Sequence, residues 1–207
     1  YAGKAPRQEQ AINLSDLVEN SAQLLRVALG HHATLMIQLA PDLPAVSADP
    51  AHLRQVLLSL IANASDALSG DCGTITVSTG IEVLQPSDFP RMLHQHTATP
   101  GPYVYLEVAD TGVGMSEEVL TRVFDPFYST KKHGSGLGLA AVLGIVHAHK
   151  GLLALCSVPE EGTRFRIYLQ PTAQQAAPVV TERPPASANE RPAPGTRVLV
   201  VDDEEIN

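Results

Sequence analysis

Residues 110–139 read DTGVGMSEEVLTRVFDPFYSTKKHGSGLGL, and the rest of the chain is organised around this stretch. It holds two glycine clusters, Gly112 with Gly114 and then residues 134–138, separated by an aromatic segment and a loop with two lysines. Glycine lets the backbone approach a ligand closely. At the start of a helix it also leaves free N–H groups that attract an anion. The stretch therefore predicts a phosphate-binding site.

The composition of the 207-residue chain restricts its class. A hydrophobic content of 44% is enough for a core, and the length suits one domain with additional segments. The formal net charge of −8 argues against a nucleic-acid partner, because phosphate backbones bind basic surfaces. The sequence has only two cysteines and no apolar run of the ~18 residues that a membrane span needs, and its first residues lack the basic-then-apolar layout of a signal peptide. We expect a cytoplasmic fragment of a longer protein, without membrane contact of its own, although the full-length protein can be membrane-tethered.

Capping signals and periodicity predict helices and strands on both sides of this stretch. Asn13 is expected to begin a helix that ends at Gly30, and Asp49 followed by Pro50 to begin another that runs to Leu68. The other predicted elements are strands at residues 34–40, 74–84 and 102–109, a short helix from residue 116, a helix at 137–149, and a hairpin of strands at 151–158 and 163–169. Residues 85–101 are expected to form a polar loop.

The predicted helix at residues 50–68 has two distinct faces. Its apolar stripe contains Leu53, Leu57, Leu60, Ile61, Ala64 and Leu68. Its narrow polar stripe contains His52, Gln55, Ser59, Asn63 and Asp66. A solvated surface is one explanation of the polar stripe. The other is a ligand-binding wall, which Ser59 and Asn63 favour because short polar residues are poor helix formers.

Three predictions concern smaller groups of residues. In the strand at 102–109, the face with Tyr103, Tyr105 and Glu107 is expected to be the wetter one. The three aromatic residues within residues 124–128 are expected to pack into a knot. Four histidines in predicted loops are expected to be polar loop residues rather than metal ligands: His31, His32, His94 and His96.

With these motifs in view, the chain resembles the ATP-binding catalytic domain of sensor histidine kinases, a branch of the GHKL fold. The resemblance covers about residues 13–169. The matching motifs are the N box at 60–67 (LIANASDA), the G1 box at 110–115 (DTGVGM), the F box at 124–127 (FDPF), the G2 box at 134–139 (GSGLGL) and the closing strand motif at 162–165 (GTRF). The resemblance implies an α+β fold, a two-layer α/β sandwich whose mixed sheet of about five strands is covered on one face by helices.

The resemblance also implies ATP and Mg²⁺ as cofactors and a role for individual residues. Asp110 would accept a hydrogen bond from the adenine amino group, and Thr163 would contact adenine, commonly through water. Asn63 would bind Mg²⁺ through its amide oxygen. Lys131 would contact the γ-phosphate, although it can equally be a solvated loop lysine. Asn63 and Lys131 are therefore the two expected catalytic residues, and Asn63 the expected metal ligand.

The expected cofactor-binding residues come from all the matching motifs and from the lid between the F and G2 boxes. They are Asn63, Asp66, Asp110, Gly112, Gly114, Met115, Phe127, Ser129, Thr130, Lys131, Gly134, Ser135, Gly136, Leu137, Gly138, Leu139 and Thr163. Gly112 and Gly114 would let the base and ribose approach. Backbone N–H groups of residues 134–138 would hold the phosphates, and Lys132 would lie in the lid.

Two departures from the family pattern leave other functions open. Ser59 stands where the family carries a second polar amide, and where ATPases of the wider fold carry a glutamate that activates water. Serine cannot take that proton at neutral pH, so phosphoryl transfer to a protein is favoured over ATP hydrolysis. The lid is also short. The alternatives are an ATP-hydrolysing GHKL protein and a nucleotide-binding docking or sensing module without kinase activity.

The resemblance divides the chain into four parts. Residues 1–12 would be a connector after the dimerisation and phosphoacceptor hairpin, and residues 13–170 the catalytic domain. Residues 171–195 are rich in proline and alanine and read as a linker. Residues 196–207 (TRVLVVDDEEIN) resemble the first strand and acidic pair of a receiver domain, which indicates a truncated hybrid kinase.

The expected partners are the upstream phosphoacceptor domain and a receiver domain, either the chain's own or that of a separate response regulator. None of the eight histidines has the sequence context of a phosphoacceptor. The fragment is therefore expected to bind ATP without phosphorylating itself. It is expected to be monomeric, whereas the full protein is expected to be a homodimer through the upstream hairpin.

Overall fold

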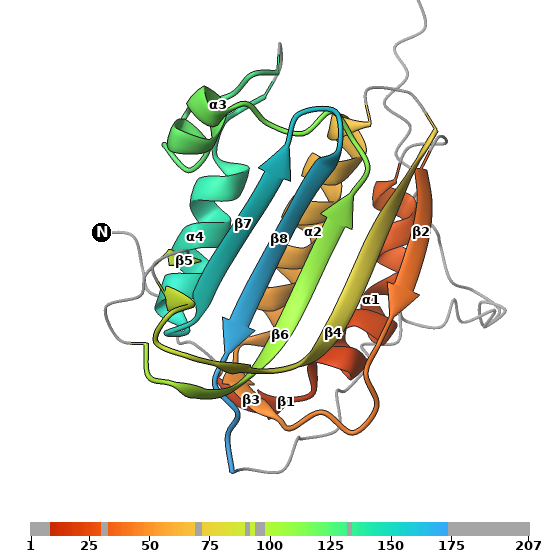
Figure 1. Cartoon of the computed structure of the whole chain (residues 1–207). Coiled ribbons are helices and arrows are strands. Elements are labelled where there is room, and N and C mark those ends of the chain that lie inside the picture. Colours follow the sequence, from red (N-terminus) through yellow and green to blue (C-terminus); the bar gives the residue numbers. More distant parts are fainter. Residues whose placement is uncertain are drawn as a thin grey trace, which may run out of the picture.

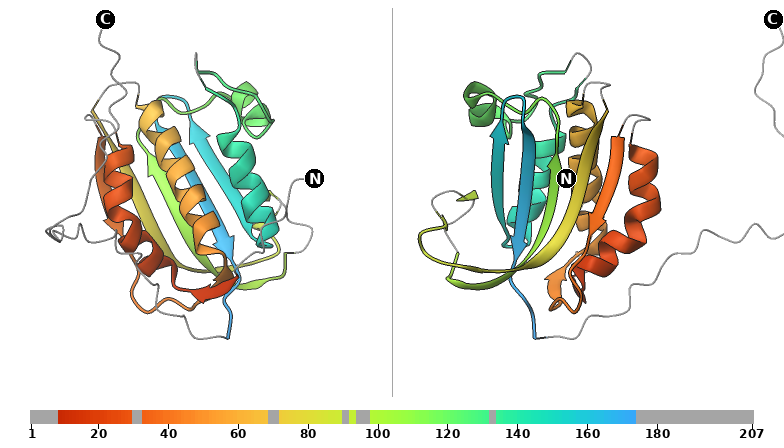
Figure 2. Two further views of the ribbon diagram at one scale, coloured as in Figure 1. Left: turned by 180° about the vertical axis from the view of Figure 1, so that it is seen from behind. Right: turned by 45° about the vertical axis from the view of Figure 1, so that its right-hand side comes forward.

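The computed structural model describes residues 9–29, 33–68, 72–89, 92–93, 98–131 and 134–173. Within them, a six-stranded sheet has the order β2-β4-β6-β8-β7-β5 and carries α1, α2 and α4 on one face (Figure 1). Seen from behind, the three helices lie side by side across the sheet (Figure 2). The predicted two-layer sandwich with a mixed sheet is confirmed, with six strands rather than about five.

The strands and helices follow the sequence signals closely. The sheet contains β2 (Ala33–Gln38), β4 (Gly73–Leu84), β5 (Met92–Leu93), β6 (Gly101–Asp110), β7 (Leu152–Val158) and β8 (Gly162–Leu169). The helices are α1 (Leu14–Ala28), α2 (Pro50–Ala67), α3 (Glu117–Arg122) and α4 (Gly138–Ala148). Strand β2 pairs in parallel with β4, and the other neighbours pair antiparallel, which makes the sheet mixed.

The two predicted helix caps are confirmed. The Asn13 side chain accepts hydrogen bonds from the backbone N–H groups of Ser15 and Asp16, which come from the first turn of α1. The Asp49 carboxylate accepts one from Ala51 N at 2.9 Å, and Pro50 stands at the first position of α2. The apolar stripe of α2 lies in the main core between helices and sheet; it also includes Val56.

Three short strands were not expected from the sequence. Residues 85–101 were predicted as loop, but Met92 and Leu93 form β5, which pairs with β7. Residues 1–12 were predicted as a connector, but β1 (Gln10–Ile12) pairs with β3 (Val46–Ala48), and Ile12 lies in the main core. Strands of two or three residues are too short to show an alternating pattern, so partners far along the chain decide them.

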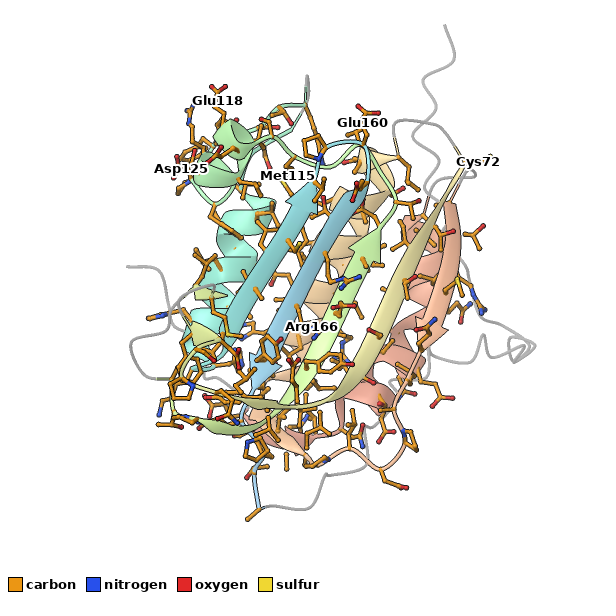
Figure 3. The ribbon with its side chains drawn as sticks, viewed as in Figure 1. Cys72, Met115, Glu118, Asp125, Glu160 and Arg166 are labelled. Carbon is orange, nitrogen blue, oxygen red and sulfur yellow. The ribbon has the colours of Figure 1, made fainter. Side chains whose placement is uncertain are left out.

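The face of β6 predicted to be the wetter one is more exposed than the opposite face, although it too is largely buried. Tyr103 is 2% and Glu107 8% exposed and Tyr105 is half-buried, against 0–2% for the alternate residues Val104, Leu106 and Val108. This face points away from the helices, since the alternate residues of β6 lie in the main core. Glu107 is buried there because Arg166 of β8 donates to it, with Nε 2.6 Å from its Oε2. Figure 3 labels Arg166 on this outer face of the sheet.

The two ends of the sheet differ. Helix α3 and the stretch that leads into α4 lie at one end (the top in Figure 1), while β1 and β3 lie at the other. Pro171, just after β8, bridges to Val46 of β3 at that second end. No described helix is long and apolar enough to cross a bilayer.

Several sequence predictions lie outside the described residues. They concern the helix end at Gly30, the four loop histidines His31, His32, His94 and His96, the lid residue Lys132, most of the linker, and the receiver-like strand near the end of the chain.

Candidate functional site

One cavity of about 550 Å³ opens between α2, the start of α4 and the segments on either side of α3. This volume is typical of a site for a small-molecule ligand. Most of the sequence-predicted binding residues line it: Asn63, Asp66, Asp110, Gly114, Met115, Ser129, Thr130, Lys131, Gly134, Ser135, Gly136, Gly138, Leu139 and Thr163. Three predicted residues do not line it: Gly112, Phe127 and Leu137.

A buried carboxylate forms one end of the cavity. Asp110 is the last residue of β6, is 8% exposed, and has Thr163 of β8 as its neighbour across the ladder. Burial raises the pKa of the Asp110 carboxyl, and hydrogen bonds from the backbone N–H groups of Gly112 and Thr163 oppose this increase. The bond from Gly112 N to Asp110 Oδ1 is 2.9 Å long. This end of the cavity therefore offers a fixed acceptor for a ligand's hydrogen-bond donor.

The two glycines after Asp110 are required by the close packing of the backbone around them. Gly114 has φ +65°, and a Cβ there would meet the carbonyl oxygen of Val158, the last residue of β7 before the turn to β8. A Cβ on Gly112 would lie 2.6 Å from the Ala67 carbonyl oxygen at the end of α2. The sequence assigns these glycines to ligand approach. The structure adds a second requirement, since the segment is held between α2 and the β7–β8 turn, near Met115 and Glu160 in Figure 3.

The start of α4 forms the opposite end of the cavity. Helix α4 begins at Gly138 after Leu137, and no side chain caps it. Gly136 has φ +66°, and its carbonyl accepts a hydrogen bond from Phe127 N at 3.0 Å. Uncapped N–H groups and the positive end of the helix dipole attract anions. This end of the cavity is therefore suited to phosphate groups.

The predicted aromatic knot is wrong for Phe127. Phe124 does pack edge-on against Phe165, with 6.5 Å between ring centroids. Phe127, however, is 78% exposed and has φ +67°. Its backbone is held by the bond to Gly136, and this contact across the loop is not visible in the local sequence. Tyr128 lies under the Arg122 guanidinium, 4.3 Å from the ring centroid, and lines the cavity.

Only part of the polar stripe of α2 lies in the cavity. Ser59, Asn63 and Asp66 line the cavity, as the ligand-wall explanation requires. His52, near the start of α2, instead lies edge-on to His149, with 5.6 Å between ring centroids. Only the second half of the stripe therefore belongs to the site.

The oxygen atoms of this wall already hold a cation. Lys131 Nζ donates to Asn63 Oδ1 at 3.0 Å and to Asp66 Oδ2 at 2.6 Å. Oxygen atoms of this kind also suit Mg²⁺, a hard ion that usually keeps waters and phosphate oxygens among its ligands. The described residues contain no cluster of three or more histidine, cysteine or carboxylate side chains for a metal. A magnesium ion at Asn63 would therefore need ligands from a bound phosphate.

The cavity also has apolar lining that the sequence did not assign to the site. It comes from Ala62, Ala64, Ala67, Val113, Val119, Val123 and Phe165, together with Tyr128. Val119 lies on α3 and Val123 just after it, and a spacing of four residues places both on the same side of the helix. This spacing was the sequence signal for a side of α3 that faces a ligand. These side chains suit the faces of a flat apolar ring.

Comparisons with known proteins show what the chain is similar to. The model of the family described as histidine kinase-, DNA gyrase B-, and HSP90-like ATPase matches residues 48–173. The sensor kinase CckA of Brucella abortus is 32% identical over 213 residues, which cover 100% of this chain and 22% of that protein. The sensor histidine kinase ZraS of Klebsiella oxytoca is 36% identical over 167 residues, covering 80% and 32%. The chain thus spans between about a fifth and a third of these two relatives.

Solved structures support the fold. The catalytic domain of the histidine kinase ThkA has a TM-score of 0.58 at 24% identity, covering 80% of this chain and 97% of that one. The full-length protein ShkA, in complex with AMPPNP, has a TM-score of 0.63 at 23% identity, covering 86% and 34%.

Proposed function

This chain belongs to the histidine kinase-, DNA gyrase B- and HSP90-like ATPase family, and we propose that it is the ATP-binding catalytic domain of a two-component sensor histidine kinase. It would deliver the γ-phosphate of ATP to a histidine on an upstream phosphoacceptor domain. One observation carries the proposal: a single cavity has a buried carboxylate at one end and the uncapped start of a helix at the other. These are the two recognition elements that an adenine base and a polyphosphate need.

At the first end, Asp110 would recognise the base. An ionised carboxylate only accepts hydrogen bonds, so it pairs with the exocyclic amino group of adenine. Guanine has a carbonyl oxygen at the corresponding position and would leave the buried Asp110 facing another acceptor. The apolar residues along α3 and α2 would cover the faces of the ring. This arrangement predicts ATP rather than GTP as the ligand.

At the second end, the chain would position and hold the phosphates. Backbone N–H groups of residues 134–138 would donate to phosphate oxygens. Mg²⁺, held by Asn63 Oδ1 and phosphate oxygens, would neutralise negative charge during transfer. Lys131 lies on the same wall and can supply a further positive charge. Because little covalent chemistry falls to such a domain, its contribution is positioning, electrostatic stabilisation and exclusion of water.

Ser59 favours transfer to a protein over hydrolysis. It lines the cavity one helical turn before Asn63, where a general base for water would stand. A serine hydroxyl is not a base at neutral pH. We therefore place the chain with the kinases of this family rather than with its ATPases. The AMPPNP complex of ShkA, which has a similar fold, supports the choice of an adenine nucleotide.

We also propose roles for the segments before and after the catalytic domain. The catalytic domain would include β1 and end near residue 170, with residues 171–195 as a linker and residues 196–207 as the beginning of a receiver domain. A phosphohistidine on the upstream hairpin would then pass its phosphate to a receiver aspartate. The chain itself would be monomeric and cytoplasmic, and the full protein would dimerise through the upstream hairpin.

Reconstitution tests the proposal. The chain is mixed with a separately expressed helical hairpin that carries a phosphoacceptor histidine from a related kinase, with γ-labelled ATP and Mg²⁺. We expect acid-labile, base-stable label on the hairpin, little free phosphate, and no labelling from GTP. Continuous phosphate release without the hairpin would instead favour an ATPase. Nucleotide binding without either reaction would favour a docking or sensing module.

A further inference from the structure

The wall of the cavity formed by α2 is already bound to the lid. Lys131 contacts two residues that stand one helical turn apart on α2, Asn63 and Asp66. Their oxygen atoms hold the ammonium group between them, at 3.0 and 2.6 Å. Lys131 thus joins the loop before α4 to the middle of the site.

The same amide oxygen cannot serve Lys131 and a magnesium ion together. Mg²⁺ binds oxygen ligands at about 2.0–2.1 Å, so an ammonium group 3.0 Å from Asn63 Oδ1 would lie within a few ångströms of the metal. Two cations at that separation repel each other, and they would also compete for the same lone pairs of the amide oxygen. Binding of Mg²⁺ at Asn63 therefore requires Lys131 to leave that oxygen.

The loop backbone connects Lys131 to the phosphate-binding end. Ser129 Oγ accepts a hydrogen bond from Lys131 N at 3.1 Å, and the Lys131 carbonyl accepts one from Gly134 N at 3.3 Å. Gly134 is the first glycine of the segment that leads into α4. A movement of Lys131 away from α2 would therefore shift the backbone that lines the phosphate end.

We propose that Lys131 and Asp66 form a latch that is exchanged for the metal: Lys131 occupies the cation position at Asn63 until Mg²⁺ arrives with the nucleotide. Asp66 is a positioning residue, which holds the ammonium beside Asn63. The displaced Lys131 then becomes available to the phosphates. This inference rests on the proposed nucleotide function and adds a regulation of that site, since metal binding and loop release become a single event.

The exposure of the partners sets the strength of the latch. The Lys131 and Asp66 side chains are 41% and 56% exposed, so solvent screens their attraction. Exposed ion pairs shift an equilibrium by less than about fivefold. The latch is thus weak enough for a metal-bound nucleotide to open it, and its removal should leave folding intact.

The first test measures the Mg²⁺ concentration that gives half-maximal ADP binding, by calorimetry on the whole chain. ADP is the probe because it lacks the γ-phosphate that Lys131 can contact. We expect Lys131→Met to lower this concentration about two- to fivefold, because the competing cation is gone. Lys131→Arg should keep the wild-type value, and so should the matched control Lys150→Met, since Lys150 follows the far end of α4.

The second test follows the loop without nucleotide. Trypsin cleaves after lysine, and its rate at a folded site depends on how often the site opens. Asp66→Asn should speed cleavage at the Lys131 site about two- to fivefold, relative to cleavage after Lys150 in the same molecules. An unchanged or raised Mg²⁺ requirement in Lys131→Met, or an unchanged loop cleavage in Asp66→Asn, overturns the latch. Failure of the wild-type chain to bind ADP at all would instead overturn the proposed function.

Discussion

Two charged clusters lie on opposite sides of the molecule and have opposite properties. In the cavity, Lys131 contacts Asn63 and Asp66, and both charged side chains are well exposed. On the outer face of the sheet, Arg166 Nε donates to Glu107 and its Nη1 to Glu82 at 2.8 Å. The Arg166 and Glu107 side chains are only 24% and 10% exposed.

The outer cluster joins three strands. Glu82, Glu107 and Arg166 come from β4, β6 and β8, and the Arg166 guanidinium also lies over the Tyr105 ring, 4.4 Å from its centroid. Burial lowers the pKa of the Arg166 guanidinium, but the hydrogen bonds and charges of Glu107 and Tyr168 more than offset this, so the group stays cationic. The clusters differ in what the loss of one partner costs. Removing one partner of the buried pair leaves an uncompensated buried charge, whereas an exposed pair can give way to a ligand.

The largest expected effect is a loss of nucleotide affinity in a variant that still folds. Asp110→Asn should weaken adenine-nucleotide binding about 100-fold, because it replaces a charge-assisted acceptor with a neutral amide. The fold should remain, since the amide oxygen can still accept from Gly112 N. Calorimetric titration and circular dichroism of the same preparation measure both. Equal nucleotide affinity in the variant and wild type would remove Asp110 from the binding site.

The second prediction concerns the outer cluster. Glu107→Gln should lower the free energy of unfolding by about 2 kcal/mol, because Arg166 would lose its most buried partner. Nucleotide affinity of the folded variant should stay within about twofold of the wild type, as the cluster faces away from the cavity. Urea unfolding and nucleotide titration check the two halves of this prediction. A large loss of affinity without loss of stability would contradict the division of roles.

The third prediction uses the raised pKa of Asp110. The folded state holds the Asp110 proton more tightly than the unfolded state does. Stability therefore falls as the pH rises from the ordinary value of 3.8 through the raised pKa, and the loss persists above it. In Asp110→Asn this loss is absent, so the variant should gain stability relative to wild type on going from acid to neutral pH. Urea unfolding across that pH range measures the difference, and a constant difference would refute it.

The smallest expected effect is on the cavity cluster. Asp66→Asn should change the free energy of unfolding by less than about 0.5 kcal/mol, because its ion pair is exposed and screened. The measurement is urea unfolding beside Glu107→Gln under identical conditions. If Asp66→Asn lowered the free energy of unfolding as much as Glu107→Gln, the two clusters would contribute equally to stability and the prediction would be wrong.

The same contrast shows what the sequence could predict. Signals that act within a few residues were reliable: Asp49 with Pro50 marked the start of α2, and the apolar stripe of that helix is buried as predicted. The predicted hairpin at the end of the domain is β7 with β8. Most of the motif residues line one cavity, because the motifs stand near the ends of elements that meet at the same end of the sheet.

Features that depend on distant partners could not be predicted. Glu107 alternates like a solvent-facing residue, and only the pairing of β6 with β8 reveals that Arg166 covers it. Phe127 lies exposed because its backbone bonds to Gly136 across the lid. The contact of Lys131 with Asp66 likewise joins residues far apart in the chain, so no local pattern indicates it.

Calorimetric titration of the chain with ADP and AMPPNP, with and without Mg²⁺, shows whether the cavity is an adenine-nucleotide site. We expect micromolar-range binding by the wild type, its loss in Asp110→Asn, and an altered Mg²⁺ dependence in Asn63→Asp. If the wild-type chain binds neither nucleotide, with or without Mg²⁺, the cavity is not an adenine-nucleotide site and the proposed function is wrong.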